Sequence, residues 1–320
     1  MLLLLALPAH AAQCVGPYAV GQRTLALVDG REVAVWYPTA PIVRSNARVA
    51  VNDGVITDAP LAACPARWPL VLFSHGVAGC NEQVLYVTEQ VASHGYVVAA
   101  PNHRDAICGI ALRKKFPIAT GATRPSFLAP QIWTATAWRG RMLDLRDTVQ
   151  LLRDDARLAR GIDFSRIGLM GHSLGGYTVL GMAGGWPGWS LPGVHAVLAF
   201  APFVAPFLAD KRLSGLRVPV MYQVAAWDLT ITPNVVQAGG AFDASPAPKY
   251  LVELAAASHM AWTNLPCRDF ASVAACLTAV PRARLVDAYA IAFLDRYLKG
   301  LPAPLLDASG KDLRQFRAQR

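Results

Sequence analysis

Six short runs of apolar residues recur along this 320-residue chain and limit the folds that it can adopt. Continuous runs of this kind are typical of strands that are covered on both faces of a sheet. Segments with a 3.6-residue apolar period lie between them and indicate helices. The alternation predicts an α/β fold with a mostly parallel sheet and helices on both faces. The predicted strands are 69–74, 96–100, 167–170, 196–201, 218–224 and 249–254, after an alternating strand at 32–38, and the predicted helices are 82–94, 140–157, 174–184 and 281–299.

Composition and the absence of internal divisions predict one globular domain over residues 12–320. Hydrophobic residues are 54% of the chain and charged residues only 16%, which allows a large core and excludes wholesale disorder. The net charge is +9, but the densest clusters of lysine and arginine are short, at 113–115 and 314–320. A nucleic-acid surface would gather them on one element with interleaved aromatic residues. We therefore predict no nucleic-acid partner, whereas weak attraction to anionic surfaces stays open.

Residues 1–11 resemble the remnant of a signal peptide. A short apolar run, 2–7, precedes the small-x-small pattern Ala9-His10-Ala11, and the run is too short to span a bilayer. No lysine or arginine stands before it, so a buried first strand is the alternative. We predict a secreted or periplasmic protein with no integral membrane segment.

The chain has six cysteines, and an even number in an exported protein suggests disulfides. Neither a CxxC motif nor histidines at ligand spacing accompany them, so no metal or other cofactor is predicted. Free buried thiols remain an alternative. Six cysteines allow 15 pairings, and the sequence does not choose among them. The short spacing favours Cys267–Cys276, and we take Cys80–Cys108 as the next pair, which leaves Cys14–Cys64.

The segment Gly171-His172-Ser173-Leu174-Gly175-Gly176 matches the G-x-S-x-G nucleophile elbow. In this motif a sharp strand-to-helix turn exposes a serine hydroxyl, and small neighbours make the turn possible. A predicted strand precedes the segment and a predicted helix follows it, as the motif requires. Ser173 is therefore the candidate nucleophile.

A serine needs a base, and the base needs an orienting acid. In enzymes with a nucleophile elbow, the three catalytic residues follow along the chain in the order serine, acid, histidine, and each lies after a strand. Asp228 follows the strand at 218–224, and His259 follows the strand at 249–254. The rival acids Asp243 and Glu253 lie in a helical region and within a strand, and His195 precedes a strand.

Hydrogen-bond donors must stabilise the oxyanion of the tetrahedral intermediate. The first predicted donor is the backbone N–H of Leu174, directly after the nucleophile. The second is the N–H of Val77, in the loop after the strand at 69–74, where Gly76 frees the backbone. His75 in this loop and His103 in PNHRD are predicted to brace loops rather than to catalyse.

These motifs, together with SHGYVVAAPNHRD and RMLDLRDTVQLL, resemble one branch of the α/β-hydrolases. This branch contains dienelactone-hydrolase-like proteins, platelet-activating-factor-acetylhydrolase-like enzymes and cutinase-type polyesterases. The resemblance spans roughly residues 68–265 and implies metal-free ester hydrolysis through an acyl-enzyme. Dienelactone hydrolases would use a cysteine where this chain has Ser173, so that particular activity is not expected.

The substrate is less constrained than the chemistry. By resemblance, Phe203 stands where cutinase-type polyesterases place an aromatic residue beside the acyl pocket. Trp227, Met260 and Trp262 flank the acid and the base and are candidate cleft residues, with ordinary packing as the alternative for the tryptophans. The 16 residues between the strands at 196–201 and 218–224 are too few for a helical cap. The long loop 105–138 is expected to be functional or partly disordered and could cover part of the cleft.

The sequence therefore predicts a monomeric serine carboxylesterase whose partner is a small ester, a lipid or a polyester. A polyesterase and a short-chain phospholipid acetylhydrolase are the alternatives within ester hydrolysis. An acyltransferase would use the same acyl-enzyme but exclude water. A binding module without catalysis is the remaining alternative on this fold.

Overall fold

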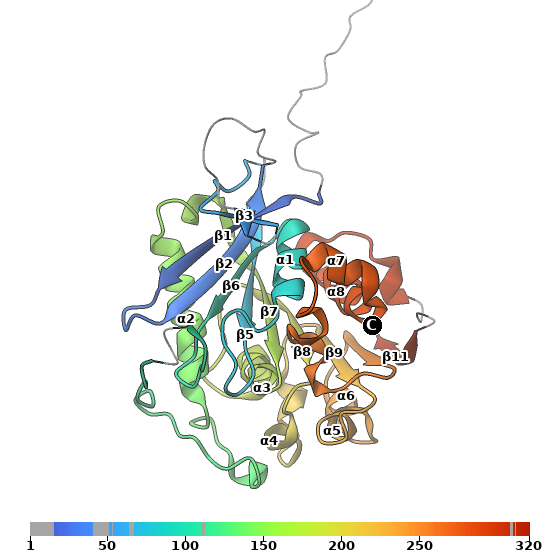
Figure 1. The fold of residues 1–320 in the computed structure, drawn as a ribbon. Coiled ribbons are helices and arrows are strands. Elements are labelled where there is room, and N and C mark those ends of the chain that lie inside the picture. Colours follow the sequence, from blue (N-terminus) through green and yellow to red (C-terminus); the bar gives the residue numbers. More distant parts are fainter. Residues whose placement is uncertain are drawn as a thin grey trace, which may run out of the picture.

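The computed structural model describes residues 16–40, 51–52, 54–63, 67–109, 113–307, 310 and 312–320. The predicted signal-peptide remnant and the predicted Cys14–Cys64 pair lie outside these residues. Within them, the chain builds one 11-stranded sheet with the order β11-β10-β9-β8-β7-β5-β6-β2-β1-β4-β3 (Figure 1).

The centre of the sheet is parallel from β6 to β10, with an antiparallel strand on either side of it, β2 next to β6 and β11 next to β10. The α/β-hydrolase fold with a mostly parallel sheet is thereby confirmed. The strands are β1 (Ala19–Ala26), β2 (Glu32–Thr39), β3 (Val51–Asn52), β4 (Val55–Thr57), β5 (Trp68–Ser74), β6 (Val97–Pro101), β7 (Ile162–His172), β8 (Val194–Phe200), β9 (Val220–Ala225), β10 (Lys249–Leu254) and β11 (Leu313–Gln319).

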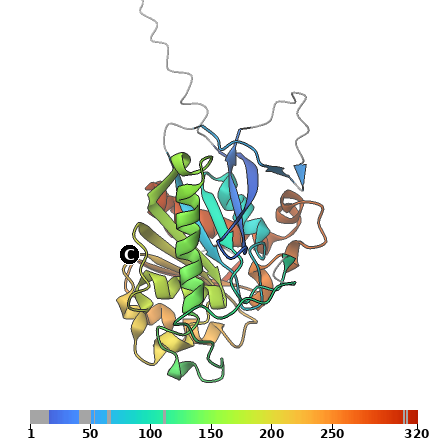
Figure 2. The same ribbon diagram turned by 90° about the vertical axis from the view of Figure 1, so that its left-hand side faces the viewer.

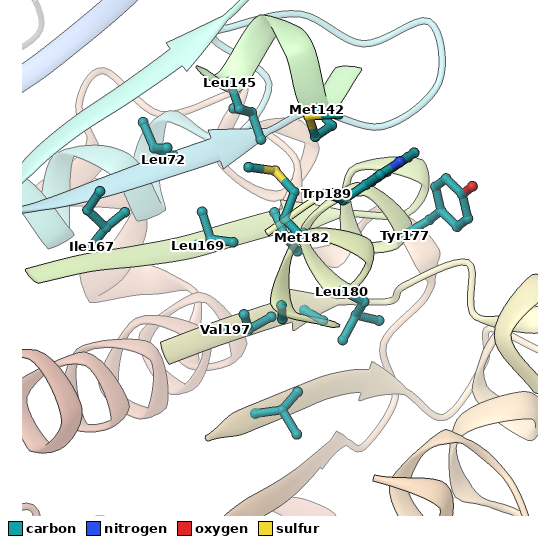
Figure 3. Close-up of a cluster of buried hydrophobic side chains, with 14 of the residues drawn as sticks. Leu72, Met142, Leu145, Ile167, Leu169, Tyr177, Leu180, Met182, Trp189 and Val197 are labelled. Carbon is teal, nitrogen blue, oxygen red and sulfur yellow. The ribbon is translucent and has the colours of Figure 1, made fainter. Parts of the chain in front are cut away.

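Helices cover both faces of the sheet, because successive residues of each strand point to opposite sides. In β5, Leu70 and Leu72 pack with the helices α2 and α3, whereas Val71 and Phe73 pack with α1 and α8. Figure 2 shows α2 running across one face, and Figure 3 shows the core beneath it. The helices are α1 (Leu85–Ser93), α2 (Arg139–Asp154), α3 (Leu174–Leu180), α4 (Ala205–Leu208), α5 (Thr232–Val236), α6 (Ala241–Ala244), α7 (Val273–Ala279) and α8 (Pro281–Leu294).

The predicted central strands and main helices are all present, with shifted ends. β7 extends the predicted strand 167–170 in both directions, and the predicted helices 174–184 and 281–299 each end in a π-turn. The strands β1 and β11 were not predicted, because β1 carries mixed polar residues and β11 lies in the basic tail. That tail is an edge strand whose arginines reach carboxylates: Arg314 pairs with Glu253, Arg317 with Asp243 and Arg320 with Asp307.

Two connections at the carboxyl ends of the strands shape the rim of the molecule. Between β8 and β9 the chain forms only α4 and one 3-10 turn, so no large cap stands there. Between β6 and α2 a long loop, which includes the 3-10 turn Pro130–Ile132, lies beside α4 in Figures 1 and 2. None of the described helices is both long and apolar enough to cross a lipid bilayer.

Two of the predicted disulfides are confirmed, Cys80–Cys108 and Cys267–Cys276. The first joins the loop after β5 to the loop after β6. The second joins the 3-10 turn Leu265–Cys267, which follows the turn that carries His259, to α7.

Candidate active site

Ser173 stands at the turn from β7 to α3 in a backbone conformation that side chains rarely adopt. Its φ of 55° and ψ of −115° are typical of a strained position, and its side chain is only half-buried. The neighbouring glycines make this turn possible. A Cβ on Gly171 would lie 2.3 Å from the oxygen of Gly175, and a Cβ on Gly175 would lie 1.8 Å from the oxygen of Ser74. The elbow therefore packs directly on the end of β5.

Asp228 and His259 are in contact at the ends of β9 and β10. Nδ1 of His259 lies 2.5 Å from one carboxylate oxygen of Asp228, and the backbone N–H of Ile231 donates to the other oxygen at 3.2 Å. The carboxylate is buried, whereas the imidazole is 32% exposed. Since Nδ1 faces the acid, Nε2 points to the opposite side of the ring.

His172, the residue before Ser173, connects the elbow to the turn of His259. The two imidazole rings lie 4.8 Å apart between centroids, and Nε2 of His172 lies 2.9 Å from the backbone oxygen of His259. Burial, and then the neighbouring His259, lowers the pKa of His172 to about 3. The ring is therefore neutral, so it can donate one Nε2–H bond to that carbonyl. This contact brings His259 against the elbow.

The loop after β5 is oriented by Arg141 from α2. Its guanidinium donates to the backbone oxygens of His75 and Gly76, the latter at 2.9 Å, and Nδ1 of His75 lies 2.7 Å from the same oxygen of Gly76. In a trans peptide, the C=O and the following N–H point in opposite directions. The N–H of Val77 therefore faces away from Arg141, and it donates to no acceptor in the described part of the chain.

The N–H of Leu174 is oriented by the same geometry. The backbone oxygen of Ser173 accepts from Tyr177 N at 3.2 Å and from Phe203 N at 3.0 Å. The N–H of Leu174 belongs to the same peptide unit and points the other way, without a protein acceptor among the described residues. The structure thus leaves two backbone donors, from the β5 loop and the elbow, in two segments that pack on one another.

A buried charged network supports the Arg141 contact. Arg141 also bonds to Asp105 at 2.6 Å. Burial opposes ionisation of Asp105, but the charge of Arg141 outweighs it and the pKa of Asp105 is lowered. Behind this pair, His103 lies between the hydroxyl of Ser74 and the carboxylate of Asp144. Sequence reasoning missed Arg141, and the only local signal was an arginine at the start of a predicted helix.

The two histidines that were predicted to brace loops do so. Nε2 of His75 accepts from the backbone N–H of His103 at 3.0 Å, so both side chains join the loops after β5 and β6. Burial, and then the charge of Arg141, holds the pKa of each well below the usual value. Both rings are fully buried.

Among the predicted substrate residues, Phe203 belongs to an aromatic cluster. Phe203 is half-buried beside the elbow, and its ring lies 5.2 Å from the rings of both Phe127 and Trp133 in the long loop. Sequence reasoning did not name these two aromatic residues, although the loop is rich in tryptophan. They form one aromatic wall with Phe203 next to Ser173.

Trp227 and Met260 are exposed, and both line a groove of about 230 Å³ with residues 256–258, 265–266 and 280. The prediction for Trp262 was wrong. Its side chain is fully buried, stacks on Phe200 and donates its indole N–H to Gln223 at 3.1 Å, so it packs the core beneath the turn and does not line an open cleft.

The rival catalytic residues are occupied elsewhere. Asp243 pairs with Arg317, and Glu253 lies within β10 and pairs with Arg314. His195 is in β8, near its amino end. Within the described residues, no three His, Cys, Asp or Glu side chains cluster closely enough to hold a metal ion.

Comparison with known proteins gives matches to esterases. Residues 41–121 match the family described as platelet-activating factor acetylhydrolase, isoform II. This segment contains β5, the Val77 loop and β6, and it ends before Ser173. Cutinase 2 of Thermobifida cellulosilytica is 26% identical over 231 residues, which are 71% of this chain and 68% of that protein.

Two further relatives agree with this. Cutinase cut1 of Thermobifida fusca is 26% identical over 71% of this chain, and the match covers 56% of that protein, so the chain spans little more than half of it. The platelet-activating factor acetylhydrolase of Cavia porcellus is 25% identical over 36% of this chain and 31% of its own length. These matches support an α/β-hydrolase of the esterase branch.

Proposed function

We propose that this α/β-hydrolase cleaves carboxylic esters through an acyl-enzyme on Ser173. The observation that carries the proposal is the contact of Asp228 with His259, against the elbow on which Ser173 stands. A half-exposed imidazole with an acid on Nδ1 is the arrangement that a general base requires. The similarity to cutinases and to an acetylhydrolase supports the same class of reaction.

In the proposed first step, Nε2 of His259 takes the proton of the Ser173 hydroxyl as the oxygen attacks the ester carbonyl carbon. Asp228 keeps the Nδ1–H tautomer and stabilises the imidazolium. The N–H groups of Val77 and Leu174 stabilise the developing oxyanion. The C–O bond to the alcohol then breaks, and His259 returns its proton to the departing oxygen.

In the second step, water replaces the alcohol. His259 takes a proton from the water as its oxygen attacks the acyl carbon, and collapse releases the acid and restores the Ser173 hydroxyl. The open rim, without a large cap between β8 and β9, gives water access to this intermediate. This favours hydrolysis over transfer to another acceptor.

The test is a series of p-nitrophenyl esters of increasing acyl length with the wild type and Ser173→Ala. We expect activity on short chains, and a loss of roughly 10⁴- to 10⁶-fold in kcat for the variant, because the reacting groups act as one unit. A fluorophosphonate probe should label the wild type at Ser173 and leave the variant unlabelled. Equal rates for the two proteins would refute the mechanism.

A second candidate within this chemistry is hydrolysis of bulky or polymeric esters. Trp227 and Met260 are exposed beside the acid and the base, and the groove that they line offers room for an extended substrate. Release of monomers from a polyester film, compared with release of acetate from a short-chain phospholipid, separates a polyesterase from an acetylhydrolase.

We also infer that the protein is exported and works as a monomer in a single catalytic domain. Two disulfides among the described residues support export, because such bonds persist in oxidising compartments. Fractionation of the producing cells and light scattering of the purified protein test the two statements.

A further inference from the structure

Large hydrophobic side chains are exposed mainly at one end of the molecule. Of the thirteen such residues in the described part of the chain, eleven lie in the segments that follow the carboxyl ends of β5, β6, β9 and β10. These are the same segments that carry Val77, Asp228 and His259. Single exposed apolar residues are ordinary, but a concentration on one face marks an interaction surface.

The long loop after β6 contributes most to this concentration. Leu128 is 95% exposed and Ile132 is 65% exposed, and Ile118 and Phe127 are exposed to a smaller extent. Exposing whole aliphatic side chains is unfavourable in water, so these positions gain most from burial in an apolar phase.

Beyond Asp105, which pairs with Arg141, the charges of the same loop all have one sign. Residues 106–138 contain no aspartate or glutamate, whereas they contain Arg113, Lys114, Lys115 and Arg124. Each of these four basic residues is exposed. Lys114 lies over the ring of Phe116 and donates to the backbone oxygen of Asp29. Lysine and arginine in one loop with exposed apolar side chains favour an interface that is both apolar and negatively charged.

The exposed residues Phe127, Leu128 and Ile132, called the apolar tip below, are supported by packed aromatic side chains. Phe127 contacts the rings of Trp133 and Trp138, at 5.4 and 5.6 Å, and Trp138 N donates to the backbone oxygen of Thr123. The indole N–H of Trp133 donates to Ser126. The apolar tip is thus presented on a fixed support, and Phe127 and Trp133 connect that support to Phe203 beside the elbow.

We propose that residues 113–138 dock this protein onto an anionic lipid surface, with Leu128 and Ile132 entering the interface and the basic residues contacting the headgroups. The loop would then hold the rim of the active site at the surface. A neutral polymer would give the acid-free, basic character of the loop no role, and a nucleic acid would leave Leu128 and Ile132 without a partner. The binding is independent of ester cleavage.

The test is cosedimentation with vesicles of phosphatidylcholine alone or mixed with phosphatidylglycerol. The wild type should bind the mixed vesicles and lose binding as salt is raised. Leu128→Ser/Ile132→Ser and Arg113→Glu/Lys115→Glu should each lower binding by roughly tenfold or more. All of these proteins should keep the wild-type rate on a soluble p-nitrophenyl ester.

Matched controls use exposed residues at the opposite end of the strands. Leu301→Ser replaces a residue that is 48% exposed, and Arg67→Glu/Arg160→Glu reverses two exposed arginines at the starts of β5 and β7. Both should bind vesicles like the wild type. Equal losses in test and control variants would overturn the proposal, as would wild-type binding in both loop variants. Binding of the wild type to a polyester film but not to vesicles would replace the lipid with a solid polymer.

Discussion

The two sides of the candidate active site differ in whether their buried carboxyl groups have a partner. Behind the Val77 loop, Asp105 and Asp144 each contact an arginine, at 2.6 and 2.8 Å. Beneath the turn of His259, Asp287 of α8 is buried, and neither of its oxygens has a hydrogen-bond partner among the described residues. Burial raises the pKa of Asp287 well above the usual value, which favours the neutral acid.

This difference matches the tasks that the proposed mechanism gives to each side. The Val77 loop has to present a backbone N–H in a fixed direction, and charged bonds to its carbonyls, together with the Cys80–Cys108 disulfide, hold that direction. The turn of His259 has to carry a ring that gains and releases a proton. Its contacts with α1 and β9 are neutral, with Tyr86 donating to Ala261 and Trp262 donating to Gln223. The N–H of Val77 and the imidazole of His259 are thus held by different sets of contacts.

The largest expected effect concerns Asp228, on the side of the site that carries His259. Asp228→Asn keeps the shape of the acid but lets His259 take the wrong tautomer, so we expect kcat to fall by roughly 10⁴-fold. The measurement is kcat on a short p-nitrophenyl ester, with Asp243→Asn as the control acid. A loss of less than tenfold in Asp228→Asn would mean that another group orients His259.

On the side of the Val77 loop, Arg141→Met should lower kcat by roughly 10²- to 10³-fold and change KM little. The reason is that the variant no longer holds the peptide that presents the N–H of Val77. Removing the arginine also leaves Asp105 buried without its cation, which costs about 3–5 kcal/mol of stability.

The double variant Arg141→Met/Asp105→Asn separates these two effects. It removes the unpaired charge, so stability should recover while kcat stays low. Recovery of kcat together with the melting temperature would show that Arg141 acts only on stability, and the positioning role would be wrong.

The smallest expected effect concerns Asp287 and is a change in stability with pH. Its raised pKa means that the folded state holds a proton which the unfolded state releases above pH ~3.9. The wild type should therefore lose about 1.4 kcal/mol per pH unit from there up to the folded pKa, and Asp287→Asn should not. At neutral pH the variant should therefore be more stable than the wild type.

For Asp105 the expected change of stability with pH has the opposite sign. The pKa of Asp105 is lowered in the folded state, so its contribution to stability is present above the unfolded value and disappears as the pH falls through the folded one. The variant should be less stable at neutral pH. Unfolding of both variants measured between pH 2 and 8 checks the pair, and parallel curves for Asp287→Asn and the wild type would remove the contrast between the two sides.

The sequence alone determined the features that depend on neighbouring residues in the chain. The apolar runs predicted the parallel strands, and the small residues around Ser173 predicted a sharp turn between β7 and α3. Because catalytic groups of this fold follow strands, counting from strand to loop was enough to select Asp228 and His259, which the structure brings into contact. The pair Cys267–Cys276 followed from its short spacing, whereas the sequence left the pairing of Cys80 with Cys108 open among several possibilities.

Only the tertiary structure decided what lies on each face of an element and which distant segments meet there. Trp262 follows His259 closely, yet its side chain turns into the core, while Trp227 stays at the surface. Arg141 reaches a loop 65 residues earlier in the chain, and Phe127 and Trp133 reach Phe203. Periodicity reports the environment of a residue averaged over one turn or one strand, whereas these contacts depend on how the elements pack, and that is fixed only when the whole core forms.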